Sequence, residues 1–275
     1  MRKIIFVPYD FSDTAKNSAK YAFGFAKNYD LDLVFYHAFD LPVVTSEASF
    51  INYPYEEIMR DKKSVLQQEI ESIADSTYSS KIKFDILVKP GFSINSIVSE
   101  AKELNAFLII MGVTKRNKIG EHIIGSSAVF TARGSKIPVL IIPEICNYEN
   151  IKKAVLSIDI SEELNEHFIE HIKFWQSFLG SELNIISVNE LIEQNKILQT
   201  AGELNAENQF SHTEHKTFYL EGEINEEIDK FTSKTKSQLL ILSPKKHSIL
   251  NDIFKNSTTK HFAYHLKIPI LCILE

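Results

Sequence analysis

The nine residues KIPVLIIPE at positions 136–144 return in slightly altered form as KIPILCILE at positions 267–275. The same spacing of 131 residues relates LIIMG at 108–112 to LLILS at 239–243. Nearer the start, KIIFVPYD at 3–10 resembles KAVLSID at 153–159, so the first copy contains a longer internal segment. A repeat of this length is typical of a duplicated domain rather than of a solenoid unit. The sequence therefore predicts two domains, at residues 1–146 and 151–275, joined by a short polar linker.

Short apolar runs alternate with amphipathic segments in both halves. Runs that are apolar throughout are typical of parallel strands covered by helices on both faces. They lie at residues 4–7, 33–39, 84–88, 107–111 and 139–142, and again at 154–158, 183–188, 217–220, 239–242 and 270–274. Helical periodicity follows from Ser12 to Lys27, from Tyr55 to Ser76, from Ser93 onward and from Ser126 to Arg133. The pattern predicts an α/β fold of two tandem, doubly wound, five-stranded parallel sheets, each with strand order 3-2-1-4-5.

Composition narrows the possible partners. The chain has 275 residues, is 44% hydrophobic and 24% charged, and carries a net charge of −6. This charge argues against a nucleic-acid partner, which would require a basic face. The two cysteines, Cys146 and Cys272, have no metal or redox spacing, which favours a reducing compartment. With no run of membrane-spanning length and no leader pattern, we expect a cytoplasmic protein without a membrane partner.

A ligand site is expected where the strand order reverses. Open parallel sheets bind ligands beyond the carboxyl ends of their strands at that point. The residues after the first and fourth predicted strands, PYD at 8–10 and GVTK at 112–115, should therefore share one crevice. Gly125, Ser126 and Ser127 then open the next helix. A helix start with free N–H groups and hydroxyls suits a phosphate, but a glycine turn with a serine N-cap explains the same residues.

These corners resemble those of the universal stress protein family, in two tandem copies. The resemblance implies an adenine nucleotide alpha hydrolase-like sheet. Asp10 matches an aspartate that contacts the adenosine part in that family, and Ala38, after His37, matches a small residue near the adenine. Gly112 and the pair Gly125-Ser126 match the family pattern Gly-x2-Gly-x9-Gly-Ser/Thr.

The resemblance implies ATP or AMP as a ligand of the first domain only. Pro8 and Asp10 would line the adenosine side with Ala38 beneath the base, and the phosphates would lie on the glycine and serine corner. That corner comprises Gly112, Gly125, Ser126 and Ser127, with Lys115 in place of the family's second glycine. The Lys115 side chain either obstructs the phosphates or pairs with them, and the sequence leaves both open. A requirement for magnesium is also left open.

The second domain departs further from the pattern. Its equivalent positions are Ser243, Lys246, Asn256 and Ser257, so every glycine is replaced, although Asp159 matches Asp10. We expect no nucleotide there by this mode. The last strands, Val139–Ile142 and from Ile270 to Leu274, are expected to pair within one chain as a pseudo-dimer, with a further homodimer left open.

One other motif carries chemistry. His167, Glu170 and His171 fit the His-x-x-Glu-His pattern of a zinc peptidase class, but their helix also carries core residues. His212 and His215 lie near each other in the sequence, and whether any of these histidines binds a metal is left open. We expect no metal site.

Three functions are compatible with these observations. The first is a stress-response protein that binds an adenine nucleotide as a regulatory ligand. The second is a nucleotide-free interaction module in which both sites are degenerate. The third, a slow ATPase, ranks lowest because the sequence offers no general base.

Overall fold

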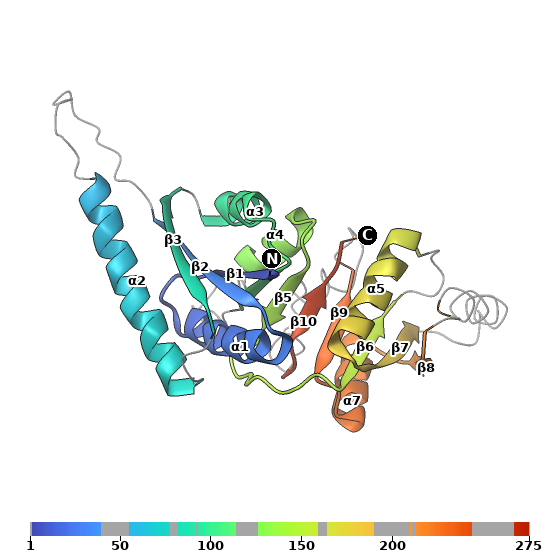
Figure 1. The fold of residues 1–275 in the computed structure, drawn as a ribbon. Helices are drawn as coiled ribbons and strands as arrows, with labels where there is room; N and C mark the ends of the chain where they lie inside the picture. Colours follow the sequence, from blue (N-terminus) through green and yellow to red (C-terminus); the bar gives the residue numbers. More distant parts are fainter. Residues whose placement is uncertain are drawn as a thin grey trace, which may run out of the picture.

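The computed structural model of the 275-residue chain describes residues 2–39, 55–77, 82–91, 93–113, 126–158, 164–189, 210, 213–243 and 267–274. Strands and helices alternate along it (Figure 1). In the N-terminal half the elements are β1 (Ile4–Pro8), α1 (Asp13–Tyr29), β2 (Asp32–Phe39), α2 (Tyr55–Thr77), β3 (Phe84–Pro90), α3 (Ser93–Glu103), β4 (Leu108–Gly112), α4 (Ser126–Gly134) and β5 (Val139–Ile142). In the C-terminal half they are β6 (Lys153–Ser157), α5 (Glu166–Leu179), β7 (Glu182–Asn189), β8 (His215–Glu221), α7 (Ile224–Thr235), β9 (Leu239–Leu242) and β10 (Ile270–Cys272).

The strands of the described residues form one ten-stranded sheet in the order β3-β2-β1-β4-β5-β10-β9-β6-β7-β8. The predicted order 3-2-1-4-5 is confirmed for β1 to β5, and all strand pairs within that half are parallel. Read from its outer edge, the C-terminal half has the same arrangement, β8-β7-β6-β9-β10. The sequence predicted two five-stranded sheets, and in the structure they are continuous.

The continuity arises at the centre of the sheet. β5 and β10 pair antiparallel, with Leu140 opposite Leu271 and Val139 opposite Cys272. Both strands are buried along their length. Each half therefore covers an apolar strand of the other, which would otherwise be an exposed sheet edge.

Helices cover both faces of the sheet because its strands are apolar on both sides. One apolar layer lies against α1, α2 and α5, and the other lies against α3, α4 and α7. Figure 1 shows α1 and α2 on one side of the N-terminal strands, with α3 and α4 on the other. The segment from Glu190 to Gln209, polar and only partly periodic, stands where the second helix of the C-terminal half is expected, and it lies outside the described residues.

An aromatic cluster joins the halves. The Phe107 ring, just before β4, lies 5.0 Å from Trp175 and 5.1 Å from Phe178 of α5, measured between ring centroids. The Lys3 ammonium lies 4.2 Å from the centroid of the Phe107 ring and 4.6 Å from that of Phe174, within cation–π range. The sequence places Leu164, Phe168, Ile172 and Trp175 in the core. Phe168, Ile172 and Trp175 are buried in α5, whereas Leu164 precedes this helix and is half-buried.

The connection between the halves is packed against α1. The Asn17 side-chain amide donates to the carbonyl oxygens of Pro143, at 3.0 Å, and Cys146, at 3.1 Å. Cys146 and Ile151 are buried. The sequence predicted a short polar linker. It did not predict that apolar and aromatic residues of this linker pack against the rest of the fold.

Candidate functional site

A pocket of about 210 Å³ lies beyond the carboxyl ends of β1, β2 and β4. It lies at the reversal of strand order because β1 pairs with β2 on one side and with β4 on the other. The start of α1, α3 and the start of α4 complete the wall. The residues that line it are Pro8, Tyr9, Asp10, Ser12, Thr14, Ala15, Tyr36, Ala38, Ile97, Met111, Gly112, Ser127 and Ala128.

Most of the residues singled out in the sequence meet in this pocket. Pro8 and Asp10 arrive from β1 and the turn after it, Ala38 from β2, Gly112 from β4 and Ser127 from α4. Ser126 is the first residue of α4, and its side chain is outside what is described. Lys115 and Gly125 also lie outside the described residues. The acidic corner and the serine corner, more than a hundred residues apart, thus face one cavity.

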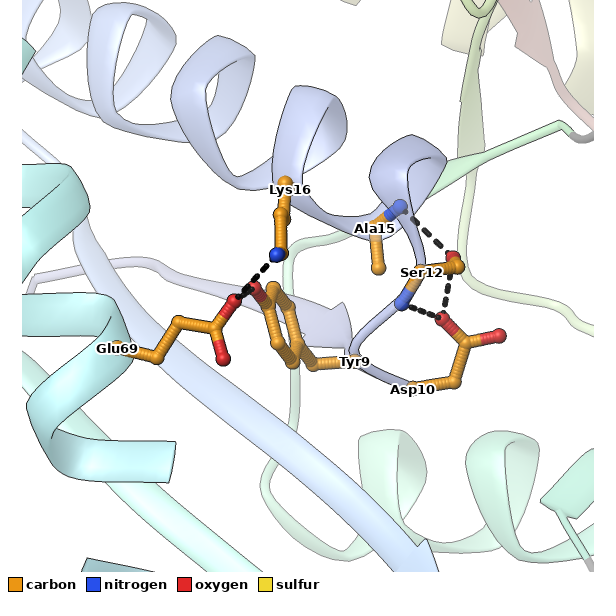
Figure 2. A network of polar contacts seen from close by, with 6 residues as sticks. All are labelled: Tyr9, Asp10, Ser12, Ala15, Lys16 and Glu69. Atoms are coloured by element: carbon orange, nitrogen blue, oxygen red, sulfur yellow. Dashed lines mark hydrogen bonds and ion pairs between the residues drawn. The ribbon is translucent and has the colours of Figure 1, made fainter. Parts of the chain in front are cut away.

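Asp10 stabilises the turn that starts α1 (Figure 2). Its Oδ1 accepts hydrogen bonds from the Ser12 backbone N–H at 3.1 Å and the Ser12 hydroxyl at 2.5 Å. Ser12 in turn caps α1, since its Oγ accepts from the Ala15 N–H at 3.2 Å. Asp10 is exposed, and a carboxylate has about four lone-pair sites on two oxygens, so it retains capacity for ligand donors.

Gly112 has a steric role at the end of β4. A Cβ atom at this position would lie 2.5 Å from the Thr14 carbonyl oxygen in the first turn of α1. Neither group can move cheaply, because both belong to the backbone of packed elements. The absence of a side chain thus lets α1 approach β4 and shapes the wall of the pocket.

Tyr9 also lines the pocket, but its hydroxyl points away from Asp10. Figure 2 shows the ring directed toward α2, where the hydroxyl donates to Glu69 at 2.9 Å. Burial, with the bond to Glu69, raises the Tyr9 pKa far above its usual value, so the hydroxyl remains a donor. Tyr9 is therefore a packing residue of the turn as well as part of the pocket wall.

His37 lies behind the same turn. Its Nδ1 lies 2.9 Å from the Tyr9 carbonyl oxygen, which can only accept, so Nδ1 carries the proton. Burial lowers the pKa of His37 and keeps the ring neutral. The residue therefore positions the backbone of Tyr9 as a neutral donor.

Sequence reasoning missed several lining residues. Tyr36 lies two residues before Ala38, and period-two alternation puts both on one face of β2. Thr14 and Ala15 belong to the first turn of α1, whose closeness to β4 depends on Gly112. Tyr36 could have been found from the alternation along the strand. Thr14 and Ala15 could not, because their place in the pocket depends on how α1 packs against β4.

At the equivalent place in the C-terminal half, few of the matching residues belong to the described part of the chain. Asp159, Lys246, Asn256 and Ser257 lie outside the described residues. Ser243 follows β9, and its buried hydroxyl has no hydrogen-bond partner among the described residues. A second hollow, of about 580 Å³, lies at the amino ends of the strands, between the end of α5 and the starts of β7 and β8.

The histidine motif on α5 does not form a metal centre in the described part of the chain. His167 and His171 lie one turn apart with ring centroids at 5.4 Å, and His167 Nδ1 is 3.7 Å from a Glu170 carboxylate oxygen. Across the described residues, no three His, Cys, Asp or Glu side chains are grouped so as to hold a metal ion. His212 is not among the described residues, while the Nδ1 of His215 hydrogen-bonds to the Thr213 carbonyl oxygen.

The fold and the pocket define a doubly wound α/β protein with a hollow at its strand-order reversal. The model of the Universal stress protein family matches residues 1–143. The chain therefore belongs to the universal stress protein family.

Two relatives illustrate the extent of the likeness. A curated universal stress protein of Methanocaldococcus jannaschii is 26% identical over 147 residues, which cover 51% of this chain and 81% of that protein. The crystal structure of a universal stress protein from Archaeoglobus fulgidus DSM 4304 covers 98% of both chains, with a TM-score of 0.69 and 18% identity. At that identity the second likeness shows the fold alone, over almost the whole chain.

None of the helices in the described ranges has the length and apolar character of a membrane span.

Proposed function

We propose that the pocket beside β1 and β4 binds an adenine nucleotide, ATP or AMP, as a regulatory ligand of a stress-response protein. The observation that carries this proposal is the convergence of an acidic turn, small residues and a helix start on one cavity. Membership of the universal stress protein family supports the stress-response part.

Charge determines how such a ligand would lie. The Asp10 carboxylate repels phosphate but accepts from hydroxyl or amine donors, so the nucleoside belongs at its end of the pocket. The N-terminus of α4 carries free N–H groups and the positive end of the helix dipole, which favours the phosphates. The ligand would therefore extend from Asp10 toward Ser127.

The walls suit a base. Pro8, Ala38, Ile97 and Met111 give apolar surface around the interior of the pocket. The volume, about 210 Å³, is below the roughly 300–1,000 Å³ of a typical ligand pocket. We infer that the nucleoside part occupies the hollow and that the phosphates lie along the start of α4.

We also propose that the chain acts as its own dimer. The domains at 1–146 and 151–275 would be held by the β5–β10 pairing and by the aromatic cluster around Phe107. Only the first domain would bind a nucleotide by this mode. The protein would act in the cytoplasm. The antiparallel strand pair is the specific observation that favours this arrangement, because it satisfies both sheet edges within one chain.

The proposal is tested by calorimetric titration of ATP, AMP and GTP into the wild-type protein and Gly125→Asp. The new carboxylate would repel phosphates at the start of α4. We expect heat with the adenine nucleotides for the wild-type protein and none for Gly125→Asp. Absence of heat for the wild-type protein at millimolar nucleotide would contradict the proposal and favour a nucleotide-free interaction module.

Hydrolysis of ATP by the protein would be a separate finding from binding. Release of phosphate above the buffer background, lost in Asp10→Ala, would be required for it. Because no general base is evident in the sequence, we expect binding without turnover.

A further inference from the structure

A carboxylate lies on the inner face of α2. Leu66, Ile70 and Ile73 form the buried stripe of this helix, and helical spacing places Glu69 among them. The Glu69 side chain is 25% exposed. A charged group at such a position is unfavourable unless it is paired, so its partners indicate why the fold tolerates it.

Glu69 has two partners, one in the wall of the pocket and one in α1. Its Oε1 accepts from the Tyr9 hydroxyl at 2.9 Å and lies 3.2 Å from the Lys16 ammonium (Figure 2). Tyr9 lies in the turn between β1 and α1, and Lys16 lies in the first part of α1. One carboxylate oxygen therefore ties α2 to both sides of the turn that carries Asp10.

The turn contains a backbone conformation that is uncommon for a bulky residue. Phe11 has φ of 65°, in the left-handed region. The Phe11 ring packs edge-on against His37 at 4.9 Å and Tyr9 at 5.4 Å. The Tyr9 N–H also donates to the Tyr36 carbonyl oxygen at 2.7 Å. Tyr9 is thus fixed by β2 through its backbone and by α2 through its hydroxyl.

We propose that Glu69 is a positioning residue for the pocket and that, acting through Tyr9, it couples α2 to the turn bearing Asp10. The ligand part of this inference rests on the proposed function. Because coupling between sites is reciprocal, a change on α2 alters the affinity of the pocket, and ligand bound at Asp10 stiffens α2. α2 is then the element through which occupancy of the pocket is presented at the surface.

Amide hydrogen exchange of the unliganded protein tests the coupling directly. The variants are Tyr9→Phe, which removes only the hydroxyl, and Glu69→Leu, which suits the apolar stripe. Glu71→Gln is the matched control, since Glu71 is exposed on the same helix and contacts Gln67. We expect exchange at Ser12 and its neighbours to be about tenfold faster in both variants, as loss of a hydrogen bond to a charged group implies, and unchanged in the control.

This readout separates positioning from mere packing. If Glu69 had only a structural role on α2, exchange in the turn would stay unchanged in Glu69→Leu whatever its melting temperature, and that result would overturn the inference. The double variant Tyr9→Phe/Glu69→Leu should exchange no faster than Glu69→Leu alone, because Glu69→Leu already removes the link through Tyr9. Fully additive effects would also overturn it.

Titration of AMP separates this inference from the proposed function. If the wild-type protein binds AMP, we expect several-fold weaker binding in Tyr9→Phe and Glu69→Leu, with Glu71→Gln equal to the wild type. If the wild-type protein binds no nucleotide, the proposed function fails, and the exchange measurement alone decides whether Glu69 positions the turn.

Discussion

Gly24 of α1 and Tyr148 of the inter-half connection are in direct contact, with no room for a side chain at position 24. A Cβ atom there would lie 2.5 Å from the nearest carbon of the Tyr148 ring. The same ring packs edge-on against Tyr21, at 5.2 Å between centroids. The connection is therefore part of the packed structure, and α1 supports it on one side while its first turn lines the pocket on the other.

Gly24→Ala tests this contact through the sign of its effect. In the middle of a helix, alanine is normally more stable than glycine by about 1 kcal/mol. Here the clash with Tyr148 outweighs that gain, because overpacking costs about 1–3 kcal/mol. We expect a net loss of up to about 2 kcal/mol in the free energy of unfolding, measured by urea denaturation. In a Tyr148→Ala background the same substitution should become stabilising, and stabilisation in both backgrounds would contradict the packing described.

Gly112→Ala should damage the pocket by displacing the first turn of α1. The added methyl group meets the Thr14 carbonyl oxygen, and we expect a loss of about 1–3 kcal/mol in stability. Nucleotide affinity should fall with it, since Thr14 and Asp10 line the same wall. Gly134→Ala is the matched control, because none of the described residues lies within 4 Å of a Cβ atom at that position. Equal behaviour of the two variants in denaturation and calorimetry would contradict the steric role.

His37 predicts how stability depends on pH. Burial lowers the pKa of its folded-state imidazole, with Lys62 adding to the effect, while the Tyr9 carbonyl oxygen and Asp10 oppose it. The unfolded chain takes up a proton near pH 6.5, and the folded chain does so only at lower pH. Stability contributed by neutral His37 is therefore complete above about pH 6.5 and declines as the pH falls below that value.

The measurement is urea denaturation between pH 7.5 and 5. His37→Asn keeps a donor for the Tyr9 carbonyl oxygen without a titrating group, so the loss of stability on acidification should be smaller than in the wild type. His167→Gln, at an exposed position, should lose as much free energy of unfolding on acidification as the wild type. An unchanged slope in His37→Asn would show that this imidazole is not the group responsible.

Phe107→Ala tests the aromatic cluster between the halves. The ring contacts Phe174, Trp175 and Phe178 beneath the Lys3 ammonium. Loss of a buried aromatic side chain costs about 3–5 kcal/mol, and a partly exposed ring such as Phe107 should cost about 2–3. Phe130→Ala, at a site 53% exposed, should change stability by about 0.5 kcal/mol or less. Similar losses for both variants in denaturation would exclude a special role for the cluster.

The sequence predicted the framework because that framework depends on local pattern. Residues 139–142 and 239–242 were placed without error, and the other strands differ from prediction mainly by a residue or two at their ends. Phe107 shows the limit of the pattern. It was assigned to a strand, whereas the strand begins at Leu108 and the Phe107 ring belongs to the contact with α5. An apolar run does not distinguish a strand residue from an interface residue.

The pocket was predictable where it depends on strand order. Asp10 and Ser127 were expected to meet because both follow strands that flank the reversal, and they line one cavity. Glu69 and Tyr148 were not anticipated, since their roles depend on partners 60 and more than a hundred residues away. Long-range side-chain contacts of this kind leave no periodic signal in a single sequence.

The most direct test of the account is a crystal structure of the protein grown with AMP. We expect electron density for the nucleoside against Asp10 and Ala38, with the phosphate at the N-terminus of α4 beside Ser127. AMP density elsewhere, or an empty pocket in crystals of a protein that binds AMP in solution, would contradict the claim that the two corners form one nucleotide site.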